Sequence, residues 1–474
     1  MKNNQKGQKP LWRITDRERR AILLLGDFLM SGSALIVSLY FWARQDQWMD
    51  FTWQFLQERP PDWYYLLPIF WLIFTIELYD PKRAGRSNDT IRGIITSTII
   101  STFLYLLVFF VSTPKSLPRR GVAAFIASAA GLTFLWRMLY IRIFTAPAFL
   151  RRVVIIGAGR AGSTLAQEIN KVNPPPYQLV GFIDDDPKKQ RKKIVGLPVL
   201  GKSTDLIKII EKEQITDMIF SISGDMRATM YAAILEAEEM GVDVTTMPVV
   251  YEAIMGRVPI SLLPDDWVLR SFVDRAHAPD SYELLKRLID LVGSFFGLIF
   301  LVVIFPIISL IIIIDDGFPV LFHQIRVGRN GKEFKLIKFR SMQKNAEEDG
   351  RPQFAVENDD RVIRVGNFLR RTHLDEIPQF INVMKGDITL VGPRAERPEM
   401  IASLQSEIPF YRARLFVKPG VTGWAQINYG YAGNVEENAI KLEHDLYYIM
   451  HRNLFMDILI ILRTISDMFG FRGL

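Results

Sequence analysis

Residues 291–314 read LVGSFFGLIFLVVIFPIISLIIII, a run of 24 residues without a charged side chain. A helix of this length extends for roughly 36 Å, enough to cross a hydrocarbon core of about 30 Å. Pro306 lies inside the run, where it removes a backbone hydrogen bond and can kink the helix. Two interpretations are open: a kinked helix that spans the bilayer, or a re-entrant hairpin that enters one leaflet and returns.

Four further apolar stretches precede this run. Each is near the ~20 residues that a transmembrane helix needs, and they cover roughly residues 21–43, 63–78, 93–113 and 121–144. Lysines and arginines cluster before the first stretch, between the second and third, and after the fourth, and the positive-inside rule assigns these positions to the cytoplasm. The pattern predicts a basic cytoplasmic tail over 1–20 and a four-helix transmembrane bundle over 21–145.

Three charged residues fall within these stretches: Asp27, Glu77 and Arg137. A charge inside a membrane span is a functional candidate by default. With the topology above, however, all three lie toward the cytoplasmic ends of their helices. We therefore expect them to snorkel or to pair with one another, rather than to form a transport path.

The composition restricts the chemistry. With 474 residues the chain is long enough for about three domains. It contains no cysteine, which excludes disulfides, thiolate metal sites and a cysteine nucleophile. A net charge of +7 in a chain that is 49% hydrophobic indicates an anionic membrane surface or anionic substrates. Because no nucleic-acid-binding motif is present, we expect no nucleic acid partner.

A glycine-rich motif follows a predicted buried strand at residues 153–156. It reads Gly157-Ala158-Gly159-Arg160-Ala161-Gly162, and a second apolar run ends at Asp184. This pattern predicts a Rossmann-like, doubly wound domain over 146–280. Two interpretations are open: the glycines and Asp184 bind a nucleotide, with the acid at a ribose hydroxyl, or the glycines serve only helix packing.

Residues 372–379 read THLDEIPQ and contain the adjacent acids Asp375 and Glu376. One carboxylate could attack phosphorus while its neighbour holds a divalent cation. Taken alone, such a pair is usually a solvated surface feature. The surrounding sequence is basic, which favours phosphate chemistry; the cations are Lys335, Lys338, Arg340, Arg361, Arg364, Arg370 and Arg371.

Three of the cations around the acids have predicted positions. If residues 334–339 form a strand, Lys338 and Arg340 lie on one face and could meet one phosphate, although a solvated strand edge would also explain them. Arg394 follows a Gly-Pro turn and could bind phosphate with two parallel hydrogen bonds. Pro378 is tolerated in a first helical turn, so we expect the acids to begin a helix.

One competing function comes from residues 282–286. Tyr282 and Lys286 match the Tyr-x-x-x-Lys signature of nicotinamide-dependent sugar-nucleotide dehydratases and epimerases. An aromatic residue and a lysine at helical spacing are also common membrane-interface anchors. A membrane-anchored dehydratase or epimerase, and a non-catalytic assembly scaffold, are the alternatives to phosphate transfer.

Five motifs in fixed order carry a family resemblance: Gln324-x-Arg326-Val327-Gly328-x-x-Gly331, Lys338-Phe339-Arg340-Ser341-Met342, Leu374-Asp375-Glu376-Ile377-Pro378-Gln379, Val391-Gly392-Pro393-Arg394 and Lys418-Pro419-Gly420-Val421-Thr422-Gly423-Trp424. Residues 282–474 strongly resemble the bacterial sugar transferase family, the polyprenyl-phosphate sugar-1-phosphate transferases. This family is also called the monotopic phosphoglycosyl transferases. The preceding bundle and Rossmann-like domain resemble its long form.

The resemblance implies an enzyme of the bacterial inner membrane whose catalytic domain, 317–474, faces the cytoplasm. It implies transfer of a hexose-1-phosphate from a UDP-sugar, expected to be UDP-glucose or UDP-galactose, to undecaprenyl phosphate with release of UMP. Such a reaction begins exopolysaccharide, O-antigen or capsule synthesis. Because nucleotide-activated donors are cytoplasmic, we favour the re-entrant form for residues 281–316, with Pro306 at the break. The large extra domains are compatible with a homodimer.

The resemblance also implies roles for individual residues. Asp375 is the expected nucleophile, which forms a phosphosugar-enzyme intermediate, and Glu376 is expected to help hold Mg²⁺. Arg370 is expected to be an active-site cation, and the substrate-binding cations are Lys338, Arg340, Arg361 and Arg394. Family members often have proline after this last arginine, whereas here Ala395 follows it, which predicts a looser loop.

Overall fold

The computed structural model describes residues 16–44, 50–79, 84–111, 118–144, 151–173, 175–221, 228–262, 279–343, 361–430 and 433–469. The chain divides into two compact units, Met1–Met247 and Pro248–Leu474.

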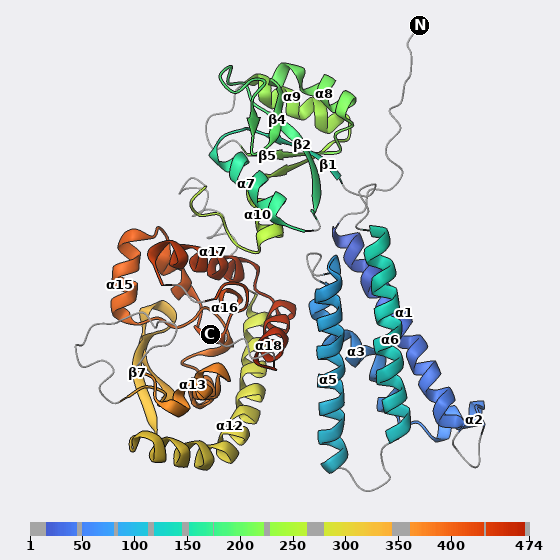
Figure 1. Ribbon diagram of the computed structural model, residues 1–474, viewed down its shortest axis with the longest axis vertical. Helices are drawn as coiled ribbons and strands as arrows, with labels where there is room; N and C mark the ends of the chain where they lie inside the picture. Colours follow the sequence, from blue (N-terminus) through green and yellow to red (C-terminus); the bar gives the residue numbers. More distant parts are fainter. Residues whose placement is uncertain are drawn as a thin grey trace. The chain divides into compact units, whose positions relative to one another are not determined.

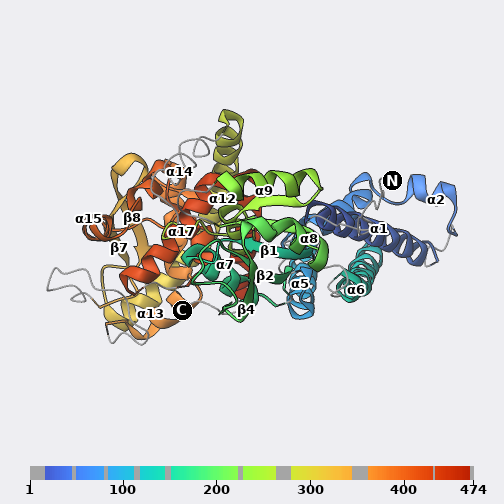
Figure 2. The ribbon, with the colours of Figure 1, turned by 90° about the horizontal axis from the view of Figure 1, so that it is seen from above.

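Helices form the first part of the N-terminal unit: α1 (Asp16–Ala43), α2 (Trp53–Glu58), α3 (Leu67–Phe74), α5 (Ser87–Val111) and α6 (Arg119–Phe144). α1 and α6 lie side by side (Figure 1, Figure 2), and α3 packs against both α1 and α5. Among the described residues of both units, three helices are long and apolar enough to cross a membrane: Glu18–Ala43, Arg119–Ile143 and Ser281–Asp316.

The second predicted span, 63–78, is not one long helix. It forms a 3₁₀ turn at Asp62–Leu66, the short helix α3 and a second 3₁₀ turn at Ile76–Tyr79. Side chains of neighbouring helices bind carbonyl groups near the break. Ser97 Oγ donates to the Phe74 carbonyl at 2.8 Å, and Arg137 Nη1 donates to the Leu78 carbonyl at 2.6 Å. These bonds allow an irregular backbone among apolar helices.

A buried ion pair joins α1 to α6. Arg137 Nη2 lies 2.6 Å from Asp27 Oδ2, and both residues are 0% exposed. The structure confirms the expected pairing of these two charges. The side chain of Glu77 lies outside the described residues.

The second part of the N-terminal unit is a sheet covered by helices on both faces. Its strands are β1 (Arg151–Ile156), β2 (Tyr177–Ile183), β3 (Lys193–Ile194), β4 (Leu197–Gly201), β5 (Asp217–Phe220) and β6 (Asp243–Thr246). Their order is β3-β4-β2-β1-β5-β6, and only the β3–β4 pair is antiparallel. Helix α7 (Arg160–Lys171) lies on one face, with α8 (Leu206–Glu213) and α9 (Ala228–Glu239) on the other (Figure 1). Opposite faces are what right-handed crossovers in opposite directions require.

The chain after the sheet leads into the C-terminal unit. The sheet ends at Thr246, and the next helix, α10 (Met247–Met255), falls almost entirely in the C-terminal unit. There Trp424 donates its indole N–H to the Gly256 carbonyl at 2.6 Å.

The C-terminal unit combines one very long helix with short strands and helices. Its helices are α12 (Asp280–Asp316), α13 (Arg364–Arg371), α14 (Phe380–Lys385), α15 (Pro398–Glu407), α16 (Trp424–Asn428), α17 (Val435–His451) and α18 (Leu454–Phe469). The strands β7 (Leu321–Val327) and β8 (Glu333–Phe339) form an antiparallel hairpin, and β9 (Thr389–Val391) pairs with β10 (Gly420–Thr422) in parallel. Strand β8 confirms the strand expected at 334–339.

Both ends of α12 are held by the same compact unit. Near its start, Lys286 Nζ lies 2.9 Å from Asp457 Oδ2 of α18. At its end, Arg340 donates to the carbonyls of Asp316 and Gly317 at 3.0 and 2.6 Å. Figure 1 shows the helix bending between these ends, and Pro306 lies within it.

Two glycines allow the rest of the unit to approach α12 closely. A Cβ atom on Gly293 would lie 2.6 Å from Leu390, and one on Gly297 would lie about 2.5 Å from the Phe380 ring. Because the two glycines are one turn apart, they form a single smooth face on which α14 and β9 rest. This contact fixes the position of α14 along the axis of α12.

We expect Arg137→Met to lower the free energy of unfolding by about 3–5 kcal/mol, because it leaves the Asp27 carboxylate buried and unpaired. Replacing both charges, with Asp27→Leu added, should recover most of that loss. Thermal unfolding of the detergent-solubilised protein measures both effects. A single variant as stable as the wild type would contradict the structural role of the pair.

Candidate active site

The acidic pair lies on a 3₁₀ turn, Leu374–Gln379, between α13 and α14. His373 adopts a left-handed conformation with φ of 55° and separates this turn from α13. The pair therefore precedes a helix, as predicted, although α14 is only six residues long. Asp375 is 8% exposed and is not a solvated surface acid.

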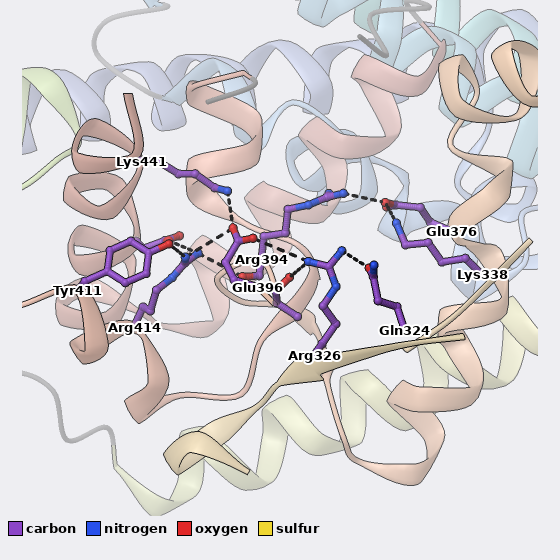
Figure 3. Close-up of polar contacts among 11 residues, drawn as sticks. Gln324, Arg326, Lys338, Glu376, Arg394, Glu396, Tyr411, Arg414 and Lys441 are labelled. Atoms are coloured by element: carbon purple, nitrogen blue, oxygen red, sulfur yellow. Dashed lines mark hydrogen bonds and ion pairs between the residues drawn. The ribbon is translucent and has the colours of Figure 1, made fainter. Parts of the chain in front are cut away.

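Two cations from different elements bind Glu376. Lys338 Nζ, from β8, lies 2.6 Å from Glu376 Oε1, and Arg394 Nη2, from the loop after β9, lies 3.3 Å from the same oxygen. Figure 3 shows the two side chains meeting at this carboxylate. Burial disfavours the charged form, but the positive charges of Lys338 and Arg394 outweigh it, so the pKa of Glu376 is lowered.

Asp375 is in a different situation although it is the next residue in the chain. Its carboxylate accepts no hydrogen bond from any residue that the structure describes. Burial raises its pKa to about 6, and the negative charge of Glu376 adds to the rise while Lys338 counteracts it. One carboxylate of the pair is thus held by cations, and the other is available to react.

The structure brings four of the predicted site residues together: Lys338, Asp375, Glu376 and Arg394. Arg370 lies in the last turn of α13, and among the described residues its side chain forms no hydrogen bond or ion pair with either acid. Arg361 lies beside the bridge between Met342 and Val362, and its carbonyl accepts from Gln343.

Arg340 does not share the site of Lys338. Strand β8 ends at Phe339, and the guanidinium of Arg340 binds the last carbonyls of α12 and lies 3.2 Å from Asp316 Oδ2. The expectation that both cations meet one phosphate was wrong, because the alternation of a strand does not continue past its last residue. The side chain, 4% exposed, secures the end of the long helix.

The glycine motif of the Rossmann-like domain is tightly packed. A Cβ on Gly162 would lie 2.0 Å from the Gly157 carbonyl oxygen, so this position admits only glycine. Gly159 begins α7, and a Cβ there would meet open space. Asp184 accepts from the Ala158 amide at 2.8 Å and from Lys189 at 2.9 Å, and these hydrogen bonds lower its pKa despite burial. Packing accounts for Gly162, and nucleotide binding stays a prediction.

The Tyr-x-x-x-Lys match has a packing role. Tyr282 and Lys286 both donate to Asp457 Oδ2, each at 2.9 Å. Tyr448 donates to the other oxygen of Asp457 at 2.7 Å. The cluster fastens α12 to α17 and α18, so the two residues have partners that require no dehydratase chemistry.

Sequence reasoning did not identify a second group of charges behind Arg394. Its members are Arg326, Glu396, Arg414 and Lys441, all partly or fully buried. Glu396 and Lys441 are 45 positions apart, so no local spacing reveals the group. The available signal was the Gln-x-Arg motif at residues 324–326, for which we predicted no role.

The acidic pair suits Mg²⁺ by its donor type. Mg²⁺ is commonly held by one or two carboxylates together with substrate phosphate oxygens. Glu376 is ionised and adjacent to Asp375, which gives that donor set. Within the described residues, no group of three or more His, Asp or Glu side chains forms a complete metal site.

The chain is similar to known protein families over two stretches of its sequence. Residues 281–470 match the family described as bacterial sugar transferase, and residues 75–248 match the family described as CoA-binding domain. A putative undecaprenyl-phosphate N-acetylgalactosaminyl 1-phosphate transferase of Bacillus subtilis (strain 168) is 42% identical over 134 residues, which cover 28% of this chain and 74% of that protein.

The chain belongs to the bacterial sugar transferase family.

Two longer relatives are named for different sugars. A UDP-N-acetylgalactosamine-undecaprenyl-phosphate N-acetylgalactosaminephosphotransferase of Aeromonas hydrophila is 41% identical over 184 residues, which are 39% of this chain and 43% of that protein. A UDP-glucose:undecaprenyl-phosphate glucose-1-phosphate transferase of Xanthomonas campestris pv. campestris is 29% identical over 339 residues, 68% of this chain and 67% of that protein. The chain thus spans less than half of the first of these bacterial sugar transferases.

In this bacterial sugar transferase we expect Asp375→Asn to be more stable than the wild type at pH 7.5. The folded-state pKa of about 6 lies above the ordinary value of about 3.8 for an aspartate, so ionisation of the folded protein costs stability as pH rises through 6. A gain of one kcal/mol would raise Tm by about 2–4 °C. The difference in Tm between Asp375→Asn and the wild type should shrink toward pH 5. If Asp375→Asn is less stable than the wild type at pH 7.5, the conclusion that a charged Asp375 is unfavourable in the folded protein is contradicted.

Proposed function

We propose that this protein transfers a hexose-1-phosphate from a UDP-sugar to undecaprenyl phosphate through a covalent intermediate on Asp375. The observation that carries the proposal is the asymmetry of the acidic pair: Glu376 is held by Lys338 and Arg394, whereas Asp375 is buried and accepts no hydrogen bond from the described residues. A carboxylate without hydrogen-bond donors keeps its lone pairs available for attack. Burial also removes the water that would weaken it as a nucleophile.

The reaction consists of two displacements at one phosphorus. In the first, an Asp375 oxygen attacks the phosphorus that bears the sugar, and the bond from this phosphorus to the bridging oxygen breaks. UMP leaves with that oxygen and its electron pair. In the second, an oxygen of undecaprenyl phosphate attacks the same phosphorus, and the Asp375 carboxylate is released. No proton has to be transferred, which agrees with a site without a paired general base.

Lys338 and Arg394 suit the charge that develops in both steps. They are fixed donors beside the carboxylate pair, and the Arg394 side chain is 41% exposed, so its guanidinium can also reach a phosphate oxygen. Bound Mg²⁺, held by Glu376, would reduce the repulsion between the anionic nucleophile and the anionic diphosphate. We propose this metal role for Glu376 together with the transfer.

We also propose that α12 is re-entrant. A straight helix of 37 residues would extend for roughly 55 Å, far beyond a membrane core of about 30 Å. Its two ends carry polar contacts, Lys286 to Asp457 and Arg340 to Asp316, within one compact unit. A bend near Pro306 lets both ends stay on the cytoplasmic side while the apolar middle enters the membrane.

The sugar is the open part of the proposal. The relatives reported above are named for glucose or for N-acetylgalactosamine. We propose an unmodified hexose, UDP-glucose or UDP-galactose, as the donor. UMP release measured with UDP-glucose, UDP-galactose and UDP-N-acetylgalactosamine in turn decides which sugar is transferred.

We expect Asp375→Asn to lower the rate of UMP release by at least about 1,000-fold, because it removes the nucleophile. The assay contains purified protein, Mg²⁺, undecaprenyl phosphate and each UDP-sugar in turn. Glu399→Gln removes an exposed acid of the same unit and should keep wild-type activity. Without acceptor, the wild type should exchange labelled UMP into the UDP-sugar, and absence of this exchange would contradict the covalent route.

The re-entrant geometry predicts that Ser281→Cys and Phe318→Cys face the same side of the membrane. The chain has no cysteine of its own, so each variant carries a single thiol. Lys212→Cys, at an 82% exposed position of the Rossmann-like domain, marks the cytoplasmic side. An impermeant maleimide should label all three from one side of oriented vesicles. Labelling of positions 281 and 318 from opposite sides would show that α12 spans the membrane.

A further inference from the structure

The loop that carries Arg394 is fixed at four consecutive carbonyl groups. The Pro393 carbonyl accepts from the Gly420 amide at 2.9 Å, and the Glu396 carbonyl accepts from the Val327 amide at 3.0 Å. Between them, the Arg394 carbonyl accepts from Arg414 Nη2 at 3.1 Å, and the Ala395 carbonyl accepts from Arg326 Nη1 at 3.0 Å. The donors come from β7, from the 3₁₀ turn Tyr411–Phe416 and from β10, so the loop can rotate at none of these peptides without losing a bond.

Two of the four donors are arginine side chains, and Glu396 balances their charge. Its carboxylate lies 3.5 Å from Arg414 Nη1 and 3.8 Å from Arg326 Nη1. Lys441 Nζ lies 2.7 Å from the same carboxylate (Figure 3). Burial opposes ionisation, but these three cations lower the pKa of Glu396 to about 2. The carboxylate is therefore charged at every physiological pH.

Arg414 is the most constrained member of this group. Its side chain is 3% exposed and also lies 2.8 Å from Asp445 Oδ2 and 2.7 Å from the Tyr411 hydroxyl. Glu396, Asp445 and Tyr411 together hold the guanidinium in one orientation, with Nη2 directed at the Arg394 carbonyl. A planar fork with several fixed partners loses little further freedom when it makes this last bond.

We infer that Arg414 is a positioning residue for the transfer reaction: it acts through the main chain of Arg394 and holds that guanidinium toward the reacting diphosphate. The inference rests on the proposed function and extends it to a residue that touches neither substrate nor the acidic pair. A displacement of about 1 Å in a catalytic group can cost about 100-fold in rate. The Arg394 side chain contacts Glu376 but is otherwise about half exposed. Because few side chains restrain it, the direction of its guanidinium depends on the main chain that carries it.

The test is a double-mutant cycle between Arg414→Lys and Arg394→Ala. Lysine keeps a positive charge between Glu396 and Asp445, so the variant should fold. Its single ammonium group cannot make all the hydrogen bonds of the guanidinium, and the bond to the Arg394 carbonyl should be lost. We expect Arg414→Lys to lower kcat/KM for the UDP-sugar by about 10–100-fold in the wild-type background. In the Arg394→Ala background the same change should lower it by less than about 3-fold, because no guanidinium is left to position.

A matched variant separates positioning from general stability. Asp457→Asn disturbs another buried charge cluster of the same unit, whose hydrogen bonds from Tyr282, Lys286 and Tyr448 involve none of the four carbonyls of the Arg394 loop. Its effect on kcat/KM should be equal in the two backgrounds. Equal effects of Arg414→Lys in both backgrounds would overturn the inference and assign Arg414 a purely structural role.

Binding of UDP, measured by calorimetry with the same four proteins, keeps the inference testable apart from turnover. Arg414→Lys should weaken UDP binding only when Arg394 is present. If the wild type releases no UMP from any donor, the proposed function fails, while the UDP-binding cycle still decides the role of Arg414. A binding cycle without coupling overturns the inference even if transfer is observed.

Discussion

The whole C-terminal unit depends on one constraint: both ends of α12 are bound to the same polar domain. The middle of this helix is apolar and mostly exposed, with Val302 73% and Ile314 77% exposed, so it requires an apolar partner, which in the proposed re-entrant arrangement is lipid. The ends carry charges that require water or charged partners. A bent helix satisfies both requirements, and α14 and β9 then rest on the Gly293 and Gly297 face near the polar end. In the proposed re-entrant arrangement, the acidic pair, on the turn directly before α14, lies close to the membrane surface.

That placement matters because the proposed reaction joins a water-soluble donor to a lipid phosphate. The site must bind an anionic donor from water and an anionic acceptor from the lipid. It therefore needs cations that are held in place but whose charge is not fully balanced by a neighbouring carboxylate. Lys338 and Arg394 are such cations, since both share the single oxygen Oε1 of Glu376. Their excess charge keeps Glu376 ionised, and the burial of Asp375 keeps its carboxylate free of competing donors. Two adjacent acids thus acquire different properties from their surroundings alone.

Local patterns in the sequence predicted the local structure well. Alternation located the strand 334–339, and hydropathy located the long helices; topology brought Asp27 and Arg137 together as expected. The predictions that were wrong concern where a pattern stops. Arg340 continues the alternation by count but follows the end of β8, and the apolar stretch 63–78 contains a break that hydropathy does not register. The charges around Glu396 were missed because their partners are distant in the chain and meet only in the folded unit.

Ala395 shows how the folded unit replaces a local device. Proline at this position would restrict one φ angle, a stabilisation of about 0.4–1 kcal/mol that acts mainly through the unfolded chain. The hydrogen bonds from Arg326 and Arg414 to the neighbouring carbonyls involve charged donors, each worth about 1.5–3 kcal/mol. The stabilisation by these hydrogen bonds is therefore larger than the stabilisation that a proline would contribute. The bonds also fix the direction of two peptide planes, whereas a proline fixes one torsion angle. The rigidity of the Arg394 loop consequently depends on two charged donors as well as on the main-chain bonds from Gly420 and Val327. The contribution of the charged donors lasts as long as the Glu396 carboxylate keeps the two arginines in place.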